Sequence, residues 1–374
     1  MSENSSPFSL VASDLDGTLF DFDCKITDYT KKLIFRLSHE KNIRFVLATG
    51  RHWGSTLSTQ KDLQQYFERA YADLADSQGG KTLSGKKHGF YVVSSNGGLV
   101  HDEDGKIVVE HQLDPAIVKE LYQSFALPYT DLKRGVNLTD EEKARQVVVP
   151  QAEMPARDGA VENEWDKGEG GLNEDPNEFS IEKVRVSAYT NKEWLITSSF
   201  LPEELMVKKF GLLPIVIDFD PEDPSNEGKS VLDSLPLEGI NKICFRSADR
   251  ALLSSFEQEL SQRFGDQISI ALSSNFCLDV GPGGISKFSA LREIAGHLGI
   301  SVQSMVSFGD SMNDKEMLEN VGKGFVMGNA QARLKKLLPH CTVIGNNNED
   351  AVAKKLEEVF NMVETPTTIT NINK

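Results

Sequence analysis

Short apolar runs alternate with longer stretches of helical periodicity near both ends of this chain, and this alternation limits the possible folds more than any other feature. Short apolar runs that end in small or polar residues are typical of buried parallel strands. Such runs lie at residues 8–13, 43–48, 90–94, 305–308 and 324–327. Helical stretches lie between them, at 28–40, at 288–298 and after Asp314. Because parallel strands need crossover connections, the pattern predicts a doubly wound α/β fold that binds ligands beyond the carboxyl ends of its strands.

The middle of the chain lacks this alternation and predicts a second domain that is inserted into the first. We predict an α/β core at residues 1–113 and 280–374, and an inserted α+β domain at 114–279. The Gly-Pro-Gly-Gly segment 281–284 would link the insert back to the core. Candidate strands of the insert lie at 184–189, 195–199, 215–219, 242–245, 268–272 and 275–280, and candidate helices at 115–124, 202–210 and 248–264.

One segment of the insert, residues 151–178, predicts a disordered acidic loop. It holds nine acidic and two basic residues and is rich in Gly, Pro and Asn. Segments of this composition bury too little apolar surface to fold. A solvated surface loop is the expected state, and a partner-binding acidic segment is the alternative.

The overall charge and the cysteines favour a cytoplasmic protein that acts on small molecules. A net charge of −16 would repel nucleic acid and anionic lipid. No apolar run reaches the roughly 18 residues that span a membrane, and the first residues lack the features of a secretory signal. The four cysteines are scattered and form no C-x-x-C pair, which is typical of reduced thiols. No obligate protein partner is evident, and any phosphate site would need its own local positive charge.

The strongest chemical signal is the pair Asp14 and Asp16, which follows the first predicted strand and precedes Gly17. Residues i and i+2 of a strand point to the same side, so two carboxylates would lie together where the sheet opens. Two anions at that distance repel each other, and a hard cation such as Mg²⁺ would offset the repulsion. One carboxylate could attack phosphorus, and the other could act as acid and base. A D-x-D pair alone is more often a turn or a helix cap.

Three further segments strengthen the chemical interpretation, because each lies at the same predicted edge of the sheet. Thr49-Gly50-Arg51 follows the second strand and offers a hydroxyl and backbone N–H groups to phosphate oxygens. Lys287 opens a helix, where its ammonium and the helix N-terminus both favour an anion. The acidic segment after the fourth strand runs Gly-Asp-Ser-Met-Asn-Asp from residue 309 to 314.

In this order, these segments resemble the four motifs of the haloacid dehalogenase superfamily. The Ser-Asn-Gly-Gly segment at 95–98, the Gly-Ile-Ser-Lys segment at 284–287 and the Met-Gly-Asn-Ala segment at 327–330 resemble the Cof-type, class IIB sugar-phosphate phosphatases. The similarity covers residues 9–113 and 280–350 and is weaker across the insert. It implies a Rossmann-like core with an inserted α+β cap that closes over the site and selects the substrate.

The resemblance also implies the catalytic and metal-binding roles. Asp14 would be the nucleophile and a metal ligand. Asp16 would be the acid/base and would bind the metal through its backbone carbonyl. Asp310 would complete the set of protein ligands to Mg²⁺. Asp314 would hold Lys287 and a metal-bound water.

Two further groups of residues would contact the substrate. Thr49, Gly50, Lys287 and Asn313 would bind the phosphoryl group, and Arg51 and Asn96 are candidates for contact with the rest of the substrate. Arg246, at the end of a predicted strand of the insert, either faces the site or is solvated, and we expect it to be solvated.

The predicted function is Mg²⁺-dependent hydrolysis of a small phosphorylated metabolite, with sugar phosphates as the favoured class, through an aspartyl phosphate. A sugar phosphomutase on the same core is one alternative, although the mutases known on this core carry a different fourth motif. An inactive metabolite-binding module is the other alternative, although a lost activity would normally remove a motif residue.

Overall fold

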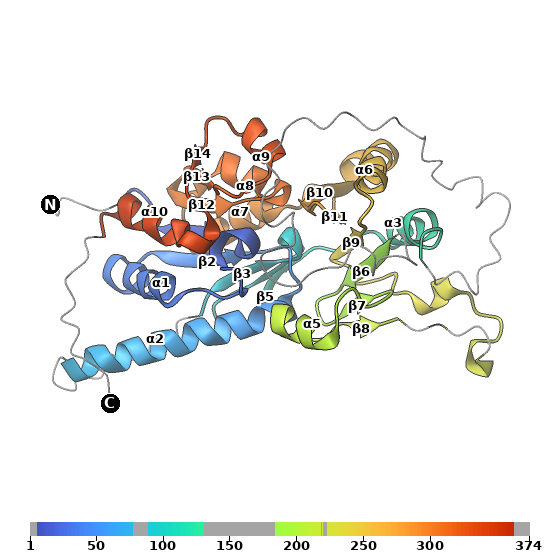
Figure 1. Cartoon of the computed structure of the whole chain (residues 1–374), viewed down its shortest axis with the longest axis horizontal. Helices are drawn as coiled ribbons and strands as arrows, with labels where there is room; N and C mark the ends of the chain where they lie inside the picture. The colour runs from blue at the N-terminus through green and yellow to red at the C-terminus, as the bar shows by residue number, and fades with distance from the viewer. Residues whose placement is uncertain (1–5, 78–88, 131–183, 218, 220–222, 363–374) are drawn as a thin grey trace.

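The computed structural model describes residues 6–77, 89–130, 184–217, 219 and 223–362. The predicted acidic loop at 151–178 lies outside these residues. In the described part of the chain, two sheets form the framework (Figure 1), and the chain completes five strands of the first sheet, then all of the second, then the rest of the first. This order confirms a core with an inserted domain.

The first sheet has the strand order β14-β13-β12-β1-β2-β3-β4-β5. Neighbouring strands from β14 to β3 are parallel, while β4 and β5 form an antiparallel edge. The strands are β1 (Leu10–Ser13), β2 (Arg44–Ala48), β3 (Tyr91–Ser94), β4 (Leu99–His101), β5 (Ile107–Glu110), β12 (Met305–Gly309), β13 (Lys323–Val326) and β14 (Thr342–Val343).

Helices cover both faces of the first sheet, so the fold is doubly wound as predicted. The helices are α1 (Asp28–Lys41), α2 (Leu57–Ser77), α7 (Lys287–Leu298), α8 (Lys315–Asn320), α9 (Ala332–Leu337) and α10 (Ala351–Phe360). Buried side chains of α1, α2, α9 and α10 pack on one face. Those of α7, with Met317 of α8, pack on the other. Because both faces of the sheet are buried by apolar side chains, these strands appear in the sequence as continuous apolar runs.

The second sheet, called the inserted sheet below, has the strand order β10-β11-β9-β6-β7-β8. Its strands are β6 (Arg185–Tyr189), β7 (Trp194–Ile196), β8 (Ile215–Val216), β9 (Lys242–Arg246), β10 (Ile268–Ser274) and β11 (Cys277–Pro282). Helices α3 (Pro115–Leu121) and α6 (Arg250–Phe264) bury one face of it. Helix α5 (Glu203–Phe210) lies beside β7 and β8, toward the first sheet (Figure 1).

The strands predicted from the sequence are confirmed, although several of them begin or end at different residues. β8 is shorter than predicted, and β11 extends into the predicted linker as far as Pro282. The short strands β4, β5 and β14 and the long helix α2 were not predicted. β14 has two exposed residues, and such an edge strand has no apolar pattern to detect.

Candidate active site

Asp14 and Lys287 form a buried ion pair at the carboxyl end of β1. The Lys287 Nζ lies 2.5 Å from Asp14 Oδ1 and 2.7 Å from Asp314 Oδ1. Lys287 is completely buried, as the first residue of α7. Burial raises the pKa of Asp14 to about 7, helped by the charges of Asp314 and Asp16 and opposed by Lys287. Burial alone would lower the pKa of Lys287, but the two carboxylates outweigh it and raise that pKa.

The loop after β12 holds Asp310 and Asp314 in fixed orientations. Asp314 Oδ2 accepts hydrogen bonds from the backbone N–H groups of Asp310 and Ser311, each at 3.0 Å. The Asp310 carboxylate accepts from the hydroxyl groups of Ser311 at 3.0 Å and Thr18 at 3.2 Å. Burial, followed by the charges of Asp14 and Asp314, raises the pKa of Asp310 well above its ordinary value.

The carboxylates of Asp14, Asp310 and Asp314 converge, since one oxygen from each lies within 4.8 Å of the others. Three carboxylates face one ammonium there, so the cluster has an excess of negative charge in a buried place. Carboxylate oxygens are the ligands that hard divalent cations prefer. The residues therefore fit a divalent cation, although the Asp314 oxygens already accept bonds from Lys287 and the backbone. The hydroxyl groups that bond to Asp310 can rotate to make room for a cation, and Lys287 holds Asp14 through one oxygen. Asp14 and Asp310 are therefore the better side-chain ligands.

Asp16 is not a member of this cluster, and its carboxylate is held by Arg51. The guanidinium donates to both carboxylate oxygens, from Nε at 2.6 Å and from Nη2 at 2.5 Å. Its Nη1 donates to the carbonyl of Lys209 in α5 at 2.7 Å, and its central carbon lies 5.0 Å from the centre of the Phe20 ring and 5.1 Å from that of Phe210. Burial would raise the pKa of Asp16, but the charge and hydrogen bonds of Arg51 outweigh it and lower that pKa. Arg51 thus links a core carboxylate to the inserted domain.

The turns after β2 and β3 lie against each other beside the acidic cluster. The Thr49 hydroxyl accepts from the Arg51 N–H at 3.1 Å, and the Asn96 N–H donates to the Thr49 carbonyl. The Asn313 amide donates to Asn96 Oδ1 at 2.9 Å. A Cβ on Gly50 would lie 2.8 Å from Asn96 Oδ1, so this packing needs a glycine there. All the residues predicted from the four motifs therefore gather at one edge of the first sheet.

Two residues of the inserted sheet, Lys242 and Asp279, also reach this edge. Their contacts with the core were not predicted from the sequence. Lys242 Nζ donates to the Gly50 carbonyl at 2.6 Å and lies 3.0 Å from Asp279 Oδ2. The same carboxylate oxygen accepts from the Asn96 amide at 2.7 Å. Both side chains are almost fully buried. The lysine directly before the apolar run Ile-Cys-Phe at 243–245 was the signal that could have revealed this contact.

The expectation that Arg246 is solvated is wrong. Arg246 is partly buried, and its guanidinium lies 4.2 Å from the centre of the Phe200 ring. Stacking on an aromatic face removes one side of the planar group from water. The expectation could not account for Phe200, because this ring belongs to a loop distant in sequence.

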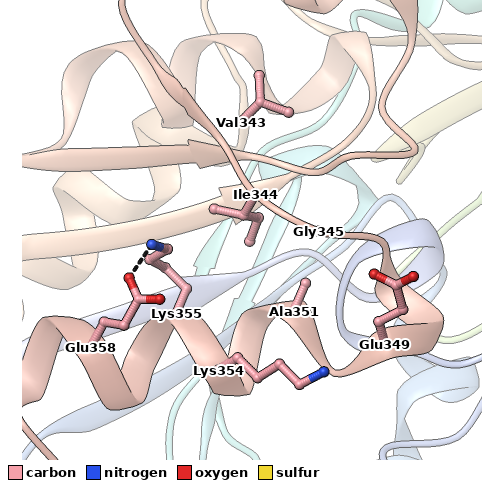
Figure 2. A pocket seen from close by; sticks show the side chains of 8 residues that line it. All are labelled: Val343, Ile344, Gly345, Glu349, Ala351, Lys354, Lys355 and Glu358. Carbon is pink, nitrogen blue, oxygen red and sulfur yellow. Dashed lines mark hydrogen bonds and ion pairs between the residues drawn. The ribbon is translucent and has the colours of Figure 1, made fainter.

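A hollow of about 330 Å³ lies elsewhere, between β14 and α10 (Figure 2). Its lining comes entirely from residues 343–358, and Lys355 pairs with Glu358 across one turn of α10. None of the predicted site residues lines it. The hollow is therefore separate from the acidic cluster.

No helix in the described part of the chain is both long and apolar enough to cross a bilayer.

Comparison with known proteins finds relatives over most of this chain. The model of the haloacid dehalogenase-like hydrolase family matches residues 11–131 and 177–356. A protein of Shigella flexneri named HMP-PP phosphatase is 29% identical over 93% of this chain and 94% of its own length. One of Cronobacter sakazakii with the same name is 25% identical over the same shares.

Solved structures show the same fold. A subclass IIB sugar phosphatase of the haloacid dehalogenase superfamily superposes with a TM-score of 0.57 at 16% identity, over 95% of this chain and all of that one. The family match spans both segments of the first sheet and the inserted sheet, and it includes every residue of the acidic cluster. The chain therefore belongs to the haloacid dehalogenase-like hydrolases and is an enzyme of the phosphatase type.

Proposed function

We propose that this enzyme hydrolyses small phosphorylated metabolites, with sugar phosphates as the favoured class, through an aspartyl phosphate on Asp14. The observation that carries the proposal is the position of Asp14 at the end of β1. Its carboxylate is buried 2.5 Å from the Lys287 ammonium and faces Asp310. A buried, oriented carboxylate beside fixed positive charge suits attack on phosphorus, because phosphoryl transfer depends mainly on alignment and charge neutralisation.

The surrounding residues would hold the phosphoryl group in line with Asp14. The Thr49 hydroxyl, the turn at Gly50, the Asn313 amide and the Lys287 ammonium lie around the same edge of the sheet. These groups donate hydrogen bonds or positive charge to phosphoryl oxygens. Such preorganised donors stabilise the charge that develops in the transition state.

Asp16 is proposed as the acid that protonates the leaving oxygen and as the base that then activates water. The carboxylate is partly exposed, so a substrate oxygen can approach it. In the structure Arg51 holds it ionised, and we propose that substrate binding separates the pair. Arg51 would then be available to the leaving group, which is the substrate contact expected from the sequence.

A divalent cation, for which we propose Mg²⁺, fits the carboxylates of Asp14 and Asp310 with the backbone carbonyl of Asp16. When bound, it would neutralise charge on the phosphoryl oxygens. Asp314 would keep Lys287 in place through the 2.7 Å contact between their side chains.

The similarity to proteins named HMP-PP phosphatase and sugar phosphatase supports a small phosphorylated substrate. We propose that the inserted domain acts as a cap that selects it, because α5, β9 and β11 supply contacts to Arg51, Gly50 and Asn96. We also propose a cytoplasmic location, consistent with the four unpaired cysteines.

The test is phosphate release from a panel of phosphorylated sugars and cofactors, with Mg²⁺ or with a chelator, for the wild type and Asp14→Asn. We expect Mg²⁺-dependent release that falls at least about 10³-fold in Asp14→Asn, because the amide cannot act as the nucleophile. Near-normal turnover by the variant would refute the role of Asp14. Interconversion of sugar phosphates without release would favour a phosphomutase instead.

A further inference from the structure

A buried ion pair of the inserted sheet contacts the core at two points. Lys242 Nζ lies 3.0 Å from Asp279 Oδ2, and both side chains are almost fully buried. Lys242 also donates to the Gly50 carbonyl at 2.6 Å, and Asp279 accepts from the Asn96 amide at 2.7 Å. A buried ion pair gives little net stability, because the loss of hydration offsets the attraction between the charges. The pair is therefore better explained by the two groups of the core that it orients.

The contact made by Lys242 fixes the peptide unit between Gly50 and Arg51. The Gly50 carbonyl and the Arg51 N–H belong to this one planar unit. A bond that holds the carbonyl therefore also sets the direction of the N–H, which donates to the Thr49 hydroxyl oxygen at 3.1 Å. A hydroxyl group that accepts a hydrogen bond still has its own proton to donate. Lys242 thereby helps to orient Thr49 as a donor to a phosphoryl oxygen.

The contact made by Asp279 orients two side-chain amides in series. A carboxylate only accepts hydrogen bonds, so the NH2 group of Asn96 must face Asp279. Asn96 Oδ1 then faces Asn313, whose NH2 group donates to it at 2.9 Å. Asn313 Oδ1 is buried and has no hydrogen-bond partner among the described residues, so the bond to Asn96 orients this amide. The second proton of the Asn313 NH2 group can then be donated to a phosphoryl oxygen.

The turn that carries Asn96 is held in a strained backbone conformation. The φ of Ser95 is +51° and that of Asn96 is +56°, in the left-handed region. Residues other than glycine keep this conformation where surrounding contacts impose it, often at functional sites. The Asn96 N–H donates to the Thr49 carbonyl at 3.2 Å, and the Ser95 N–H donates to the Arg51 carbonyl at 2.9 Å. Both contacts of the ion pair therefore act on one hydrogen-bonded unit, made of the turns after β2 and β3.

We propose that the two members of this ion pair are positioning residues, which orient Thr49 and Asn313 toward the phosphoryl group of the substrate. This inference rests on the proposed function, which assigns phosphoryl binding to Thr49 and Asn313. It adds that the inserted domain aids the chemical step as well as substrate selection. Because the oriented donors contact the phosphoryl group, loss of the pair should slow all phosphorylated substrates alike, whatever their leaving group.

The main test is the double variant Lys242→Met/Asp279→Leu, which replaces the ion pair by apolar side chains of similar size. Such replacements are often neutral for stability, because no unpaired charge stays buried. Urea denaturation should therefore show a folded protein. The kcat/KM for phosphate release should nevertheless fall about tenfold or more, since Thr49 and Asn313 lose their orientation. A phosphorylated hexose, a phosphorylated pentose and pyridoxal phosphate should show the same fold loss.

Single variants separate orientation from charge. Asp279→Leu and Asp279→Asn both remove the negative charge, but asparagine keeps an oxygen that can accept from the Asn96 amide. Asp279→Asn should therefore retain most of the kcat/KM that Asp279→Leu loses. Glu257→Gln is the control, because it removes another ion pair between the two domains, in which Arg333 donates to Glu257 at 3.1 and 3.2 Å. This control should leave kcat/KM unchanged.

An unchanged kcat/KM in the folded double variant, equal losses in Asp279→Asn and Asp279→Leu, or losses that differ among leaving groups would overturn the proposal. If the double variant fails to fold, Asn96→Gly removes the same link at a position where glycine tolerates the positive φ, and it should show the same uniform loss. Calorimetry with inorganic phosphate and Mg²⁺ separates this proposal from the proposed function, because it needs no turnover. Phosphate binding about tenfold weaker than in the wild type would support the positioning role, and equal binding would refute it, whatever the result with Asp14→Asn.

Discussion

At the scale of single residues, the site depends on charges that are buried together. Lys287 is completely buried between Asp14 and Asp314, and Asp310 lies in the same cluster. A buried charge is tolerated only with partners that compensate for its lost hydration. Each member of the cluster therefore affects folding as well as chemistry.

Replacing Lys287 by Met should lower the free energy of unfolding by about 3–5 kcal/mol, because it leaves buried carboxylates without a counter-charge. Urea denaturation in the presence of a chelator measures this loss without interference from a bound cation. Lys315→Met is the matched control, because Lys315 forms a partly exposed pair with Glu319 at 2.7 Å. The free energy of unfolding should fall by less than about 0.5 kcal/mol in Lys315→Met. Similar losses for both variants would contradict the argument.

Gly17 is required because its backbone has a positive φ and because a side chain there would clash with Asp310. A second glycine, Gly239, has the same backbone conformation without the clash, so the two effects can be separated. The φ of Gly17 is +72°, and an added Cβ would lie 2.6 Å from Asp310 Oδ2. Gly239 has φ +73° with nothing within 4 Å of an added Cβ. Gly239→Ala should show only backbone strain, about 1–2 kcal/mol. Gly17→Ala should lose more stability and about 10²-fold in kcat/KM, because Asp310 is displaced. If Gly17→Ala and Gly239→Ala lost the same amount of thermal stability and of phosphate release, the steric contribution would be excluded.

At the scale of elements, strand ends and a helix start bring the site together. Asp14 follows β1, Thr49 follows β2 and Asp310 follows β12, and all three strands are parallel neighbours around β1. Lys287 is placed by the start of α7, where the Ser286 side chain accepts from the Ser289 N–H. The carboxyl ends of parallel strands meet at one edge, so the fold gathers these residues without long loops.

Ser286→Ala should destabilise the start of α7 by about 1 kcal/mol, as expected for loss of an N-cap. Ser286 also donates to Glu316 of α8 at 2.5 Å, so the substitution should loosen Lys287 and reduce phosphate release. Ser301→Ala is the control, since Ser301 caps only a short turn before β12. We expect its effect on stability to be below about 0.5 kcal/mol and its activity to be unchanged. Equal loss of activity in both variants would argue against a positioning role for the cap.

At the scale of the whole molecule, the core and the inserted domain meet through buried polar contacts. His52 of the core illustrates this, because its Nδ1 accepts from the Gly54 N–H and its Nε2 lies 3.1 Å from the Thr190 carbonyl of the insert. This arrangement requires a neutral ring with its proton on Nε2. Burial lowers the pKa of His52 to about 4, and the nearby charge of Lys242 acts in the same direction.

Stability should therefore depend on the protonation of His52. The pKa is about 6.5 in the unfolded chain and about 4 in the folded one, so the unfolded state binds more protons between these values. The contribution is complete above about pH 6.5 and is lost as the pH falls toward about 4, by up to about 3 kcal/mol. Urea denaturation across this range should show a shallower pH dependence for His52→Gln than for the wild type. His340→Gln, at an exposed position, should keep the wild-type dependence, and identical curves for all three proteins would contradict the prediction.

The class of fold, the position of most core strands and the identity of the motif residues could all be predicted from the sequence. Apolar runs and helical periodicity are local properties, so the strands around Asp14 and Asp310 could be placed without coordinates. The carboxylates at the strand ends and the lysine at the start of a helix were equally evident from the sequence. Their convergence at one edge followed from the general geometry of parallel sheets.

The pairing of these side chains depends on the packing of the whole fold and could not be predicted from the sequence. Arg51 was expected to contact the substrate, yet it binds Asp16 and the carbonyl of Lys209. Lys242 and Asp279 were not recognised, because their contact with the core depends on how the inserted sheet packs against it. Such contacts join residues far apart in the chain, and their energies depend on burial and orientation, which no local pattern records.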